Sequence, residues 1–200
     1  MKKQKLLLIV GCGRSGTSYI CELLQKSGIH IKHEEEGIDG IVSWPMTTGD
    51  SSIPPLGPTF EDYEFKNIFH QIRNPTKTIA SSLTISESSW QYIKKYIPIK
   101  DDDSKLVMAA KYWYYWNLLA EKIANFRYRI EDIDNALPII INKIGKGKFD
   151  HNNINNTSKK INTRKHDEIM LNNIKAEDSD LFNNIINLAR KYGYPEEELI

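Results

Sequence analysis

Cysteine is scarce in this sequence, and its placement suggests neither a crosslink nor a metal site. The chain of 200 residues contains two cysteines, Cys12 and Cys21. One falls in a predicted loop and the other in the helix predicted to follow it, and their spacing is not that of zinc ligands. We therefore expect no structural disulfide, no bound metal and, with reduced thiols, a cytoplasmic location.

Excess charge and long hydrophobic runs are also missing. Lysine and arginine total 27 against 26 aspartate and glutamate residues, which gives a net charge of +1. This balance provides no general attraction to nucleic acid, so any anion-binding site must be local. The basic start, Met1–Lys5, precedes the apolar run 6–10. That run is too short for the core of a signal peptide, and no segment approaches the length of a membrane span.

Short apolar segments alternate with amphipathic ones along most of the chain. This alternation predicts an α/β fold, a parallel sheet flanked by helices in three layers, within a single domain of residues 1–200. The predicted strands are 5–10, 29–32, 67–73 and 127–130, and the predicted helices are 17–27, 39–46, a segment from 75, 104–125, 135–144 and 179–192. Ser179 is the expected N-cap of the last helix. Residues 145–160 are rich in glycine, asparagine and lysine and are predicted to be a mobile loop.

A glycine-rich loop follows the first predicted strand. Residues 11–18 read Gly-Cys-Gly-Arg-Ser-Gly-Thr-Ser, and a helical pattern begins at Thr17. A strand, a glycine loop and a helix N-terminus together hold a phosphate through backbone N–H groups. The spacing fits the P-loop of nucleotide-binding proteins, G-x-x-x-x-G-K-[ST], except that Thr17 replaces the lysine. That lysine serves the β- and γ-phosphates of a triphosphate. The nearest cation here is Arg14, so we expect a different phosphate ester; a tight turn without a ligand is the alternative.

A second candidate segment follows the predicted strand 67–73. Arg73 precedes Asn74 and Pro75, and Ser81 stands eight residues after the arginine, about two turns into the next predicted helix. Ligands of parallel sheets bind beyond the carboxyl ends of the strands, so this segment and the glycine loop should share one edge. A guanidinium group pairs bidentately with phosphate oxygens, and Arg73 with Ser81 could hold a second phosphate. Taken alone, a salt-bridged arginine and a solvent-facing serine are the simpler interpretation.

Together and in this order, the two segments resemble the nucleotide motifs of the sulfotransferase family, which uses 3′-phosphoadenosine 5′-phosphosulfate (PAPS). The family's 5′-phosphosulfate loop often reads R-S-G-T-[ST], which is similar to residues 14–18. Its 3′-phosphate motif reads R-[DN]-P with a serine eight residues after the arginine, similar to residues 73–81. Residues 128–133 resemble a later R-Y-E-D-L segment. The resemblance implies a P-loop-NTPase-like sulfotransferase fold, PAPS as the donor and no metal.

The resemblance also implies a role for each matching residue. The glycine loop would bind the 5′-phosphosulfate, and Arg14 would in addition neutralise the departing phosphate. Arg73 and Ser81 would bind the 3′-phosphate, and a late basic loop with Arg164 and Lys165 would close over it; a solvated basic loop is the alternative. The donor-binding residues expected on this basis are Gly13, Arg14, Ser15, Gly16, Thr17, Ser18, Arg73, Ser81, Arg164 and Lys165.

An acceptor hydroxyl must lose its proton as it attacks sulfur, so the reaction needs a base. In the family the base is a glutamate or a histidine, often near the end of the second strand, where this chain has the run His33-Glu34-Glu35-Glu36. Glu34 is the first candidate and His33 the second. Neighbouring carboxylates can raise one another's pKa, which would help a base near neutral pH. An exposed acidic turn is the alternative interpretation.

Two other functions stay open at this point. A P-loop kinase or NTPase with a degenerate motif would need Mg²⁺ and a lysine at position 17, where the chain has threonine. A nucleotide-binding module of the same fold without activity is the second alternative. The aromatic run 112–116 favours a helix buried on most sides over a stacking platform. The acceptor could be a sugar, a peptide tyrosine or a small alcohol, and no nucleic acid or membrane span is expected.

Overall fold

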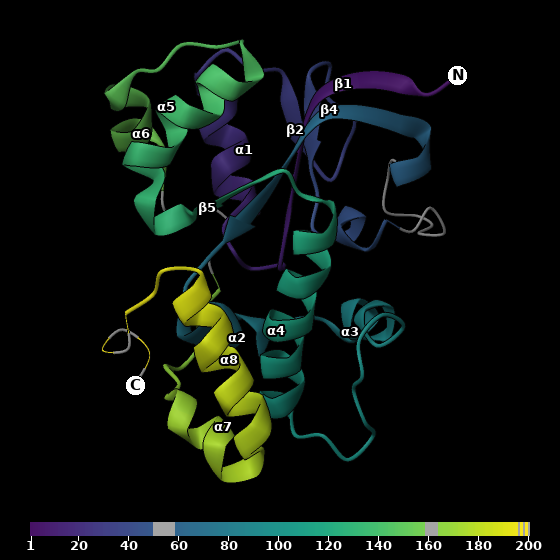
Figure 1. The fold of residues 1–200 in the computed structure, drawn as a ribbon, viewed down its shortest axis with the longest axis vertical. Coiled ribbons are helices and arrows are strands. Elements are labelled where there is room, and N and C mark those ends of the chain that lie inside the picture. Colours follow the sequence, from purple (N-terminus) through teal and green to yellow (C-terminus); the bar gives the residue numbers. More distant parts are fainter. Residues whose placement is uncertain (50–58, 159–163, 196, 198, 200) are drawn as a thin grey trace.

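The computed structural model describes residues 1–49, 59–158, 164–195, 197 and 199. Its centre is a five-stranded sheet in the order β2-β3-β1-β4-β5, and every pair of neighbouring strands is parallel (Figure 1). The strands are β1 (Lys3–Gly11), β2 (Ile31–His33), β3 (Gly40–Val42), β4 (Tyr63–Ile72) and β5 (Phe126–Arg129). The predicted α/β fold with a parallel sheet is confirmed.

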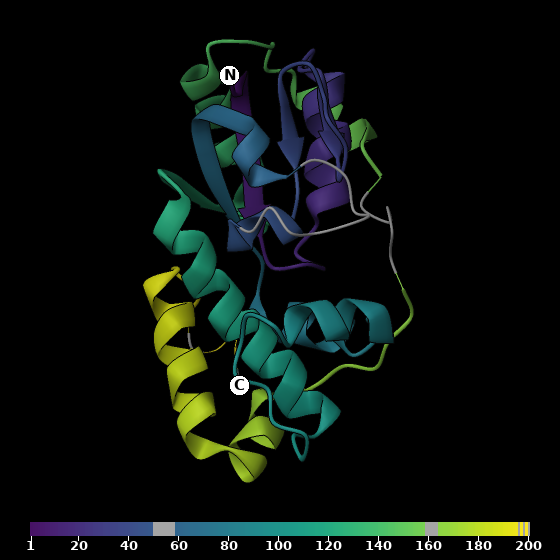
Figure 2. The same cartoon turned by 90° about the vertical axis from the view of Figure 1, so that its right-hand side faces the viewer.

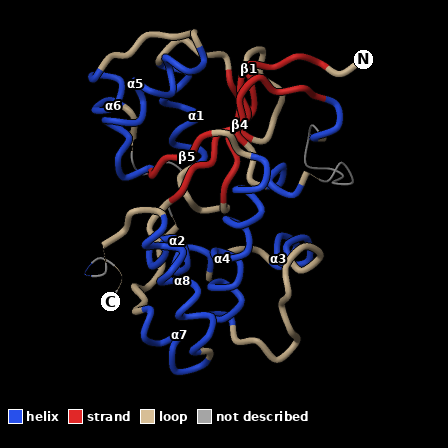
Figure 3. The backbone as a smooth tube through the Cα atoms, in the orientation of Figure 1, coloured by secondary structure: helices blue, strands red, loops and turns tan. Residues whose placement is uncertain are grey.

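Helices cover both faces of this sheet. They are α1 (Thr17–Lys26), α2 (Pro75–Ser82), α3 (Glu87–Ile93), α4 (Lys105–Ile123), α5 (Ile133–Ile144), α6 (His151–Asn156), α7 (Leu171–Glu177) and α8 (Ser179–Lys191). Figure 3 shows α1, α5 and α6 beside the strands, whereas α2, α3, α7 and α8 gather in the other half of the molecule. The long helix α4 extends from the sheet into that half. No helix in the described part of the chain has the length and hydrophobicity needed to cross a membrane.

The middle strand, β1, shows how the sequence produces these layers. Successive side chains of a strand point to opposite faces of the sheet. Leu7 and Ile9 pack in the cluster that contains α1 and α5, and Leu8 and Val10 pack in the cluster that contains the end of α4. A strand buried on both faces reads as a continuous apolar run. That is why the first predicted strand is uniformly hydrophobic.

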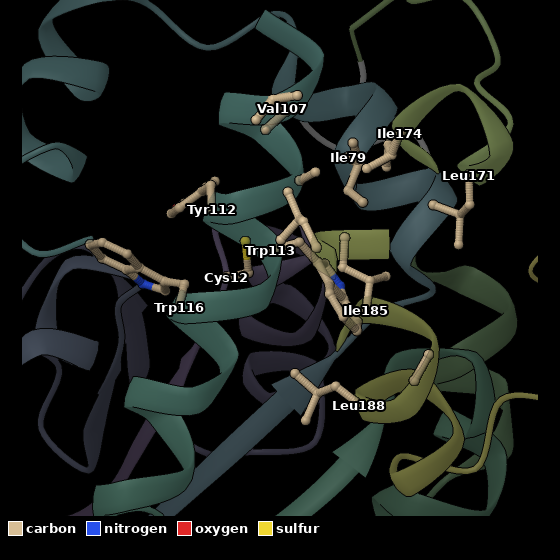
Figure 4. Packing of buried hydrophobic residues seen from close by; sticks show 14 of the residues in the cluster. Cys12, Ile79, Val107, Tyr112, Trp113, Trp116, Leu171, Ile174, Ile185 and Leu188 are labelled. Atoms are coloured by element: carbon tan, nitrogen blue, oxygen red, sulfur yellow. The ribbon is translucent and has the colours of Figure 1, made fainter. Parts of the chain in front are cut away.

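The aromatic helix α4 is buried on most sides, as predicted. Tyr112, Trp113 and Trp116 are each at most 1% exposed. Figure 4 shows Trp113 directed toward Ile185 and Leu188 of α8, while Tyr112 and Trp116 point to the other side of α4. Figure 2 shows α8 running alongside α4. Because different faces of α4 meet different neighbours, its aromatic run is chiefly a packing feature.

Residues 39–46 do not form the predicted helix. They contain β3 and the start of a 3₁₀ turn, Pro45–Thr48. The cause is tertiary, because β3 pairs with both β1 and β2. Gly40 passes so close to β1 that an added Cβ would lie 2.0 Å from the carbonyl oxygen of Leu7. A three-residue strand that is buried throughout carries no alternation from which to predict it.

The segment 145–160, predicted to be a loop, contains the short helix α6. Asp150 caps this helix, since its carboxylate accepts a hydrogen bond from the backbone N–H of Asn152 at 2.8 Å. Ile154 is its one buried residue and joins the cluster around α1. A helix with one apolar residue has no hydrophobic periodicity, so sequence reasoning had no signal for it. The mobility of the segment stays a prediction, and residues 159 and 160 lie outside the described residues.

Candidate functional site

The loop between β1 and α1 depends on glycine for its path. Gly16 has a φ of 91° at the N-terminus of α1, a left-handed conformation that favours glycine. A Cβ added to Gly11 would lie 2.3 Å from the carbonyl oxygen of Gln71, and one added to Gly13 would lie 2.6 Å from the hydroxyl oxygen of Tyr112. The glycines therefore allow both a tight turn and close packing of the loop against β4 and α4.

Side chains from three other elements hold this loop in place. Gln71 of β4 donates its Nε2 hydrogen to the carbonyl oxygen of Ser15 at 2.8 Å, and Tyr128 of β5 donates its hydroxyl hydrogen to Oε1 of Gln71 at 2.7 Å. The hydroxyl oxygen of Tyr112 accepts a hydrogen bond from the N–H of Gly13 at 2.8 Å. All three bonds are buried, so water does not compete for them and they stiffen the loop. Sequence reasoning missed these residues because their partners are distant in the chain.

The segment after β4 contacts the glycine loop directly. Asn74 caps α2, because its side chain accepts a hydrogen bond from the backbone N–H of Lys77 at 3.3 Å. Arg73 donates from Nη1 to the carbonyl oxygen of Arg14 at 2.9 Å, and Arg14 donates from Nε to Oγ of Ser81 at 3.0 Å. Three residues predicted from two separate motifs thus form one hydrogen-bonded network.

A cavity of about 420 Å³ lies between these two segments. It is lined by Arg14, Ser15, Gly16, Thr17, Ser18, Tyr19, Arg73, Lys77, Ser81, Ile130, Glu131, Ile133, Asp134, Arg164 and His166. Of the ten residues expected to bind the donor, eight belong to this lining. The other two are Gly13, which bonds to Tyr112, and Lys165, which is exposed.

Positive charge dominates this cavity. Four cationic side chains line it, those of Arg14, Arg73, Lys77 and Arg164. Burial and the charges of Arg164 and Arg73 lower the pKa of Arg14, so an anion placed among these groups would be stabilised. The hydroxyl of Ser15 is buried and makes no hydrogen bond within the described part of the chain, which leaves it able to bind such an anion. In the described ranges no three His, Cys, Asp or Glu side chains are grouped to hold a metal ion.

Seven residues of the lining were not among those expected from the sequence, and two of the seven, Lys77 and His166, are basic. Lys77 lies four residues before Ser81 on α2, and residues at this spacing share a helix face. That spacing could have identified it. His166 lines the cavity together with Arg164, which donates a hydrogen bond to the carbonyl oxygen of Thr84. His166 carried no comparable signal, because the path of its segment is set by tertiary contacts.

His33, at the end of β2, lies beside the start of α1. Its Nε2 is 3.0 Å from Oγ1 of Thr17 and 3.4 Å from Oγ of Ser18. His33 therefore contacts two residues of the cavity lining, although the lining does not include it. Burial lowers the pKa of His33, so the imidazole is neutral at pH 7 and can accept a proton.

Glu34 is held by the segment that follows β3. Its Oε2 accepts a hydrogen bond from the Ser43 hydroxyl at 2.9 Å and its Oε1 accepts one from the Trp44 N–H at 3.3 Å. Oε1 also lies 3.7 Å from Nε2 of His33. Burial raises the pKa of Glu34 to about 7, although the two hydrogen bonds act in the opposite direction. Its φ of 57° is left-handed, which costs a residue with a side chain about 1–2 kcal/mol.

The other two glutamates of the acidic run do not reinforce Glu34. Glu35 pairs with Lys32 at 3.2 Å on the surface, and Glu36 pairs with Lys3 at 2.8 Å. Hydrogen bonds from lysine, that of Lys3 first, lower the pKa of Glu36 to about 2. The expectation that neighbouring carboxylates raise one another's pKa is therefore wrong here. Burial is what raises the pKa of Glu34, and the side chains of Glu35 and Glu36 pair with lysines instead.

Comparison with known proteins gives matches among solved structures. No family model matches the chain, and no curated protein matches it. It is similar to the sulfotransferase domain from the curacin biosynthetic pathway, with 10% identity and a TM-score of 0.50 over 76% of this chain and 77% of that one. It is also similar to mouse sulfotransferase SULT7A1 complexed with PAP, with 14% identity and a TM-score of 0.48 over 82% of this chain and 68% of that one. The chain has the sulfotransferase fold that its two motifs predict.

Proposed function

We propose that this protein is an enzyme that transfers a sulfuryl group from PAPS to an acceptor hydroxyl. The observation that carries the proposal is the network in which Arg14 of the glycine loop bonds to Ser81 and accepts a bond from Arg73. Through it, the two motifs for two phosphates meet at one cationic cavity of about 420 Å³. The fold shared with the curacin-pathway sulfotransferase domain supports the proposal.

PAPS carries two phosphate groups on one adenosine, and the cavity offers two sets of phosphate ligands. The backbone N–H groups and hydroxyls of residues 15–18 would hold the 5′-phosphosulfate. Arg73 and Ser81 would hold the 3′-phosphate. Arg14 belongs to the glycine loop and bonds to Ser81 and Arg73 of the second set, and its charge would stabilise the phosphate oxygen that leaves sulfur. In this proposal guanidinium groups supply the charge that a metal ion supplies in triphosphate chemistry.

The acceptor proton would pass to Glu34 or His33. The acceptor oxygen forms a bond to sulfur while the bond between sulfur and the phosphate oxygen breaks, and 3′-phosphoadenosine 5′-phosphate (PAP) leaves with the electron pair. Glu34 is the first choice, because a carboxyl with a pKa of about 7 is both ionised and basic near neutral pH. His33 is the second, since it is neutral and contacts Thr17 and Ser18 of the cavity lining.

Two substitutions test which residue is the base. They also test the alternative that the protein is a nucleotide-binding module without activity. Removing the base, by Glu34→Gln or His33→Ala, should lower transfer by about 100-fold or more while PAP affinity stays unchanged. Glu35→Gln is the matched control, because this neighbouring carboxylate is exposed and pairs with Lys32. If both site variants transfer sulfate as well as the wild type, neither residue is the base. Binding of PAP without transfer to any acceptor would favour the module.

Isothermal titration separates this proposal from a P-loop kinase or NTPase. We expect PAP to bind and MgATP to bind weakly or not at all, because position 17 is threonine rather than the lysine that serves a triphosphate. Binding of MgATP without binding of PAP would overturn the proposal. Arg164→Ala should weaken PAP binding and the matched variant Lys165→Ala should not, since both residues are exposed but only Arg164 lines the cavity.

The acceptor belongs to one of three classes in this proposal, which are sugars, tyrosine-containing peptides and small alcohols. Each offers the hydroxyl that the reaction needs. A screen of these classes with labelled donor identifies the acceptor by the appearance of labelled product. Nucleic acid is not included, because the net charge of +1 provides no attraction to it.

A further inference from the structure

His33 lies where two elements are fixed against their neighbours. It is the last residue of β2, and hydrogen bonds hold the chain on either side of it. Gln25 of α1 donates from Nε2 to the carbonyl oxygen of Ile31 at 2.7 Å. The backbone N–H of Glu34 donates to the carbonyl oxygen of Val42 in β3 at 2.9 Å. The imidazole is therefore held beside the first turn of α1.

Three oxygen atoms surround one nitrogen of this imidazole. Nε2 lies 3.0 Å from Oγ1 of Thr17, 3.4 Å from Oγ of Ser18 and 3.7 Å from Oε1 of Glu34. Thr17 and Ser18 both line the cavity. A nitrogen without a hydrogen would need the hydroxyl hydrogens of both residues and would be repelled by an ionised Glu34. A nitrogen that carries a hydrogen is attracted to all three oxygens, of which that of Thr17 is the nearest.

The position of the imidazole proton decides what Thr17 can offer to a ligand. A neutral imidazole carries its one proton on either Nδ1 or Nε2. With the proton on Nε2, His33 donates to Oγ1 of Thr17, and the hydroxyl hydrogen of Thr17 remains for a ligand. With the proton on Nδ1, Thr17 donates its hydrogen to His33 and presents only lone pairs to the cavity. A phosphate or sulfate oxygen needs donors, so a bound anion favours the first arrangement.

Building on the proposed transfer from PAPS, we propose that His33 is a positioning residue and not the base. Its Nε2–H donates to Oγ1 of Thr17 and directs the hydroxyl hydrogen of Thr17 to the 5′-phosphosulfate. Nε2 then carries its own proton and takes none from the acceptor. Glu34 is left to accept that proton, and Ser43 and Trp44 hold its carboxylate.

The need for such a partner follows from the residue at position 17. A triphosphate-binding loop has lysine there, and an ammonium group is a cation with three donors and no lone pair. A threonine hydroxyl rotates and can turn its hydrogen away from the ligand. A hydrogen bond from His33 to Oγ1 restricts that rotation. Donors that are oriented in advance stabilise charge without a cost of reorganisation.

Substitutions at position 33 separate a positioning residue from a base. Glutamine carries its amide about as far from the backbone as Nε2, so it can donate to Thr17, but an amide takes up no proton near neutral pH. His33→Gln should therefore keep PAP affinity and transfer within about threefold of the wild type. His33→Ala should weaken PAP binding by about threefold to tenfold, whereas loss of a base alone would leave it unchanged. His33→Asn is the matched control, because the same amide on a shorter side chain reaches only as far as Nδ1 and should not restore binding.

A double-variant cycle tests whether His33 acts through Thr17. Thr17→Val removes the hydroxyl and should weaken PAP binding by about tenfold or more, the effect of a hydrogen bond to a charged group. Adding His33→Ala to Thr17→Val should weaken binding by less than about a further twofold, because the hydroxyl that His33 directs is already absent. Isothermal titration measures each PAP affinity, and denaturant unfolding shows that each variant is folded.

The outcomes separate this inference from the proposed function. If His33→Ala leaves PAP affinity unchanged, or if the losses in the cycle are additive, the positioning role is wrong while the use of PAPS stands. A loss of transfer of about 100-fold or more in His33→Gln, with PAP affinity intact, would make His33 the base. If PAP does not bind the wild type, both proposals fall.

Discussion

At the scale of single residues, Glu34 has an unusual combination of properties. Its backbone is left-handed, its carboxylate is held by Ser43 and Trp44, and burial raises its pKa to about 7. A buried carboxyl of this kind costs the folded protein free energy once it ionises. Features that cost stability and persist in a fold are often found at functional sites.

Glu34→Gln should remove part of the pH dependence of stability. The carboxyl ionises near its ordinary pKa of 4.5 in the unfolded chain and near 7 in the folded one. The folded state thus binds more protons between these values, and the free energy of unfolding falls as the pH rises from 4.5 through 7. One pKa unit corresponds to about 1.4 kcal/mol. Denaturant unfolding below and above this range measures the effect, and a variant that loses stability as steeply as the wild type would contradict it.

Arg73→Ala should weaken PAP binding more than it weakens binding of adenosine 5′-phosphate, which lacks the 3′-phosphate. A hydrogen bond to a charged group contributes about 1.5–3 kcal/mol, so the difference should be about tenfold or more. Arg73 also donates to the carbonyl oxygen of Arg14, and that part of the loss would affect both ligands. Parallel titrations measure the two affinities. Equal losses would mean that Arg73 acts through the glycine loop alone.

At the scale of elements, the glycine loop is a turn whose neighbours come within contact of its backbone. Gly13 donates its N–H to the hydroxyl oxygen of Tyr112 on α4, and Gln71 on β4 binds the carbonyl oxygen of Ser15. The loop is therefore shaped before any ligand arrives, which reduces the ordering cost of binding. Its shape depends on α4 and β4 as much as on its own glycines.

Gly13→Ala should destabilise the protein by about 1–3 kcal/mol through overpacking, because the new Cβ would lie 2.6 Å from the hydroxyl oxygen of Tyr112. Tyr112→Phe should also destabilise, by about 1–3 kcal/mol, since it leaves a buried N–H without a partner. The double variant should lose less free energy of unfolding than the two single variants lose together, because phenylalanine lacks the hydroxyl oxygen that clashes with the new Cβ. Denaturant unfolding measures all three, and strictly additive losses would contradict the contact.

The helix α8 begins with a different cap from the one predicted. Asp178, rather than Ser179, is the N-cap, and its Oδ1 accepts a hydrogen bond from the backbone N–H of Leu181 at 2.9 Å. Asp178→Ala should lower the free energy of unfolding by about 1 kcal/mol, whereas Ser179→Ala should change it by about 0.5 kcal/mol or less. Thermal or denaturant unfolding distinguishes the two, and a larger effect of Ser179→Ala would restore the sequence-based prediction. Neither variant should alter PAP binding.

At the scale of the whole molecule, a residue near the end of the described chain supports the site. The hydroxyl of Tyr194 bonds to Oε2 of Glu131, and Oε1 of Glu131 bonds to the backbone N–H of Asn74, the cap of α2. The segment after α8 is thereby connected to the start of the helix that carries Ser81. Helices in the lower half of Figure 1 thus contribute to the cavity at the edge of the sheet.

Tyr194→Phe should lower the free energy of unfolding by about 1.5–3 kcal/mol, because it removes a hydrogen bond to a charged group and leaves the carboxylate short of a donor. PAP affinity should fall as well, since the N-terminus of α2 loses its support. Tyr115→Phe on α4 is a suitable control. Tyr115 is half-buried, and Tyr115→Phe should change the free energy of unfolding by no more than about 0.5 kcal/mol. If the two variants unfold alike, the Tyr194–Glu131 bond contributes nothing to stability.

Local patterns were enough to predict the main course of the chain. The strands β1, β4 and β5 and the helices α1, α2 and α4 were expected near their observed positions, because each carries an apolar run, a cap or a helical period of its own. The strand β3 and the helices α6 and α7 were not predicted. Each is short, and each depends on contacts with other elements. In β3, for example, Gly40 passes close to the carbonyl oxygen of Leu7.

The sequence by itself determined the fold class, the glycine loop and the second motif, since these depend on residues within a few positions of one another. Only the tertiary structure decided that Arg14, Arg73 and Ser81 share hydrogen bonds, that Glu34 is buried enough to raise its pKa, and that Tyr19 and Asp134 line the same cavity. The physical reason is that burial and side-chain contact are properties of pairs far apart in the chain. Their distances are set by how the sheet and its helices pack.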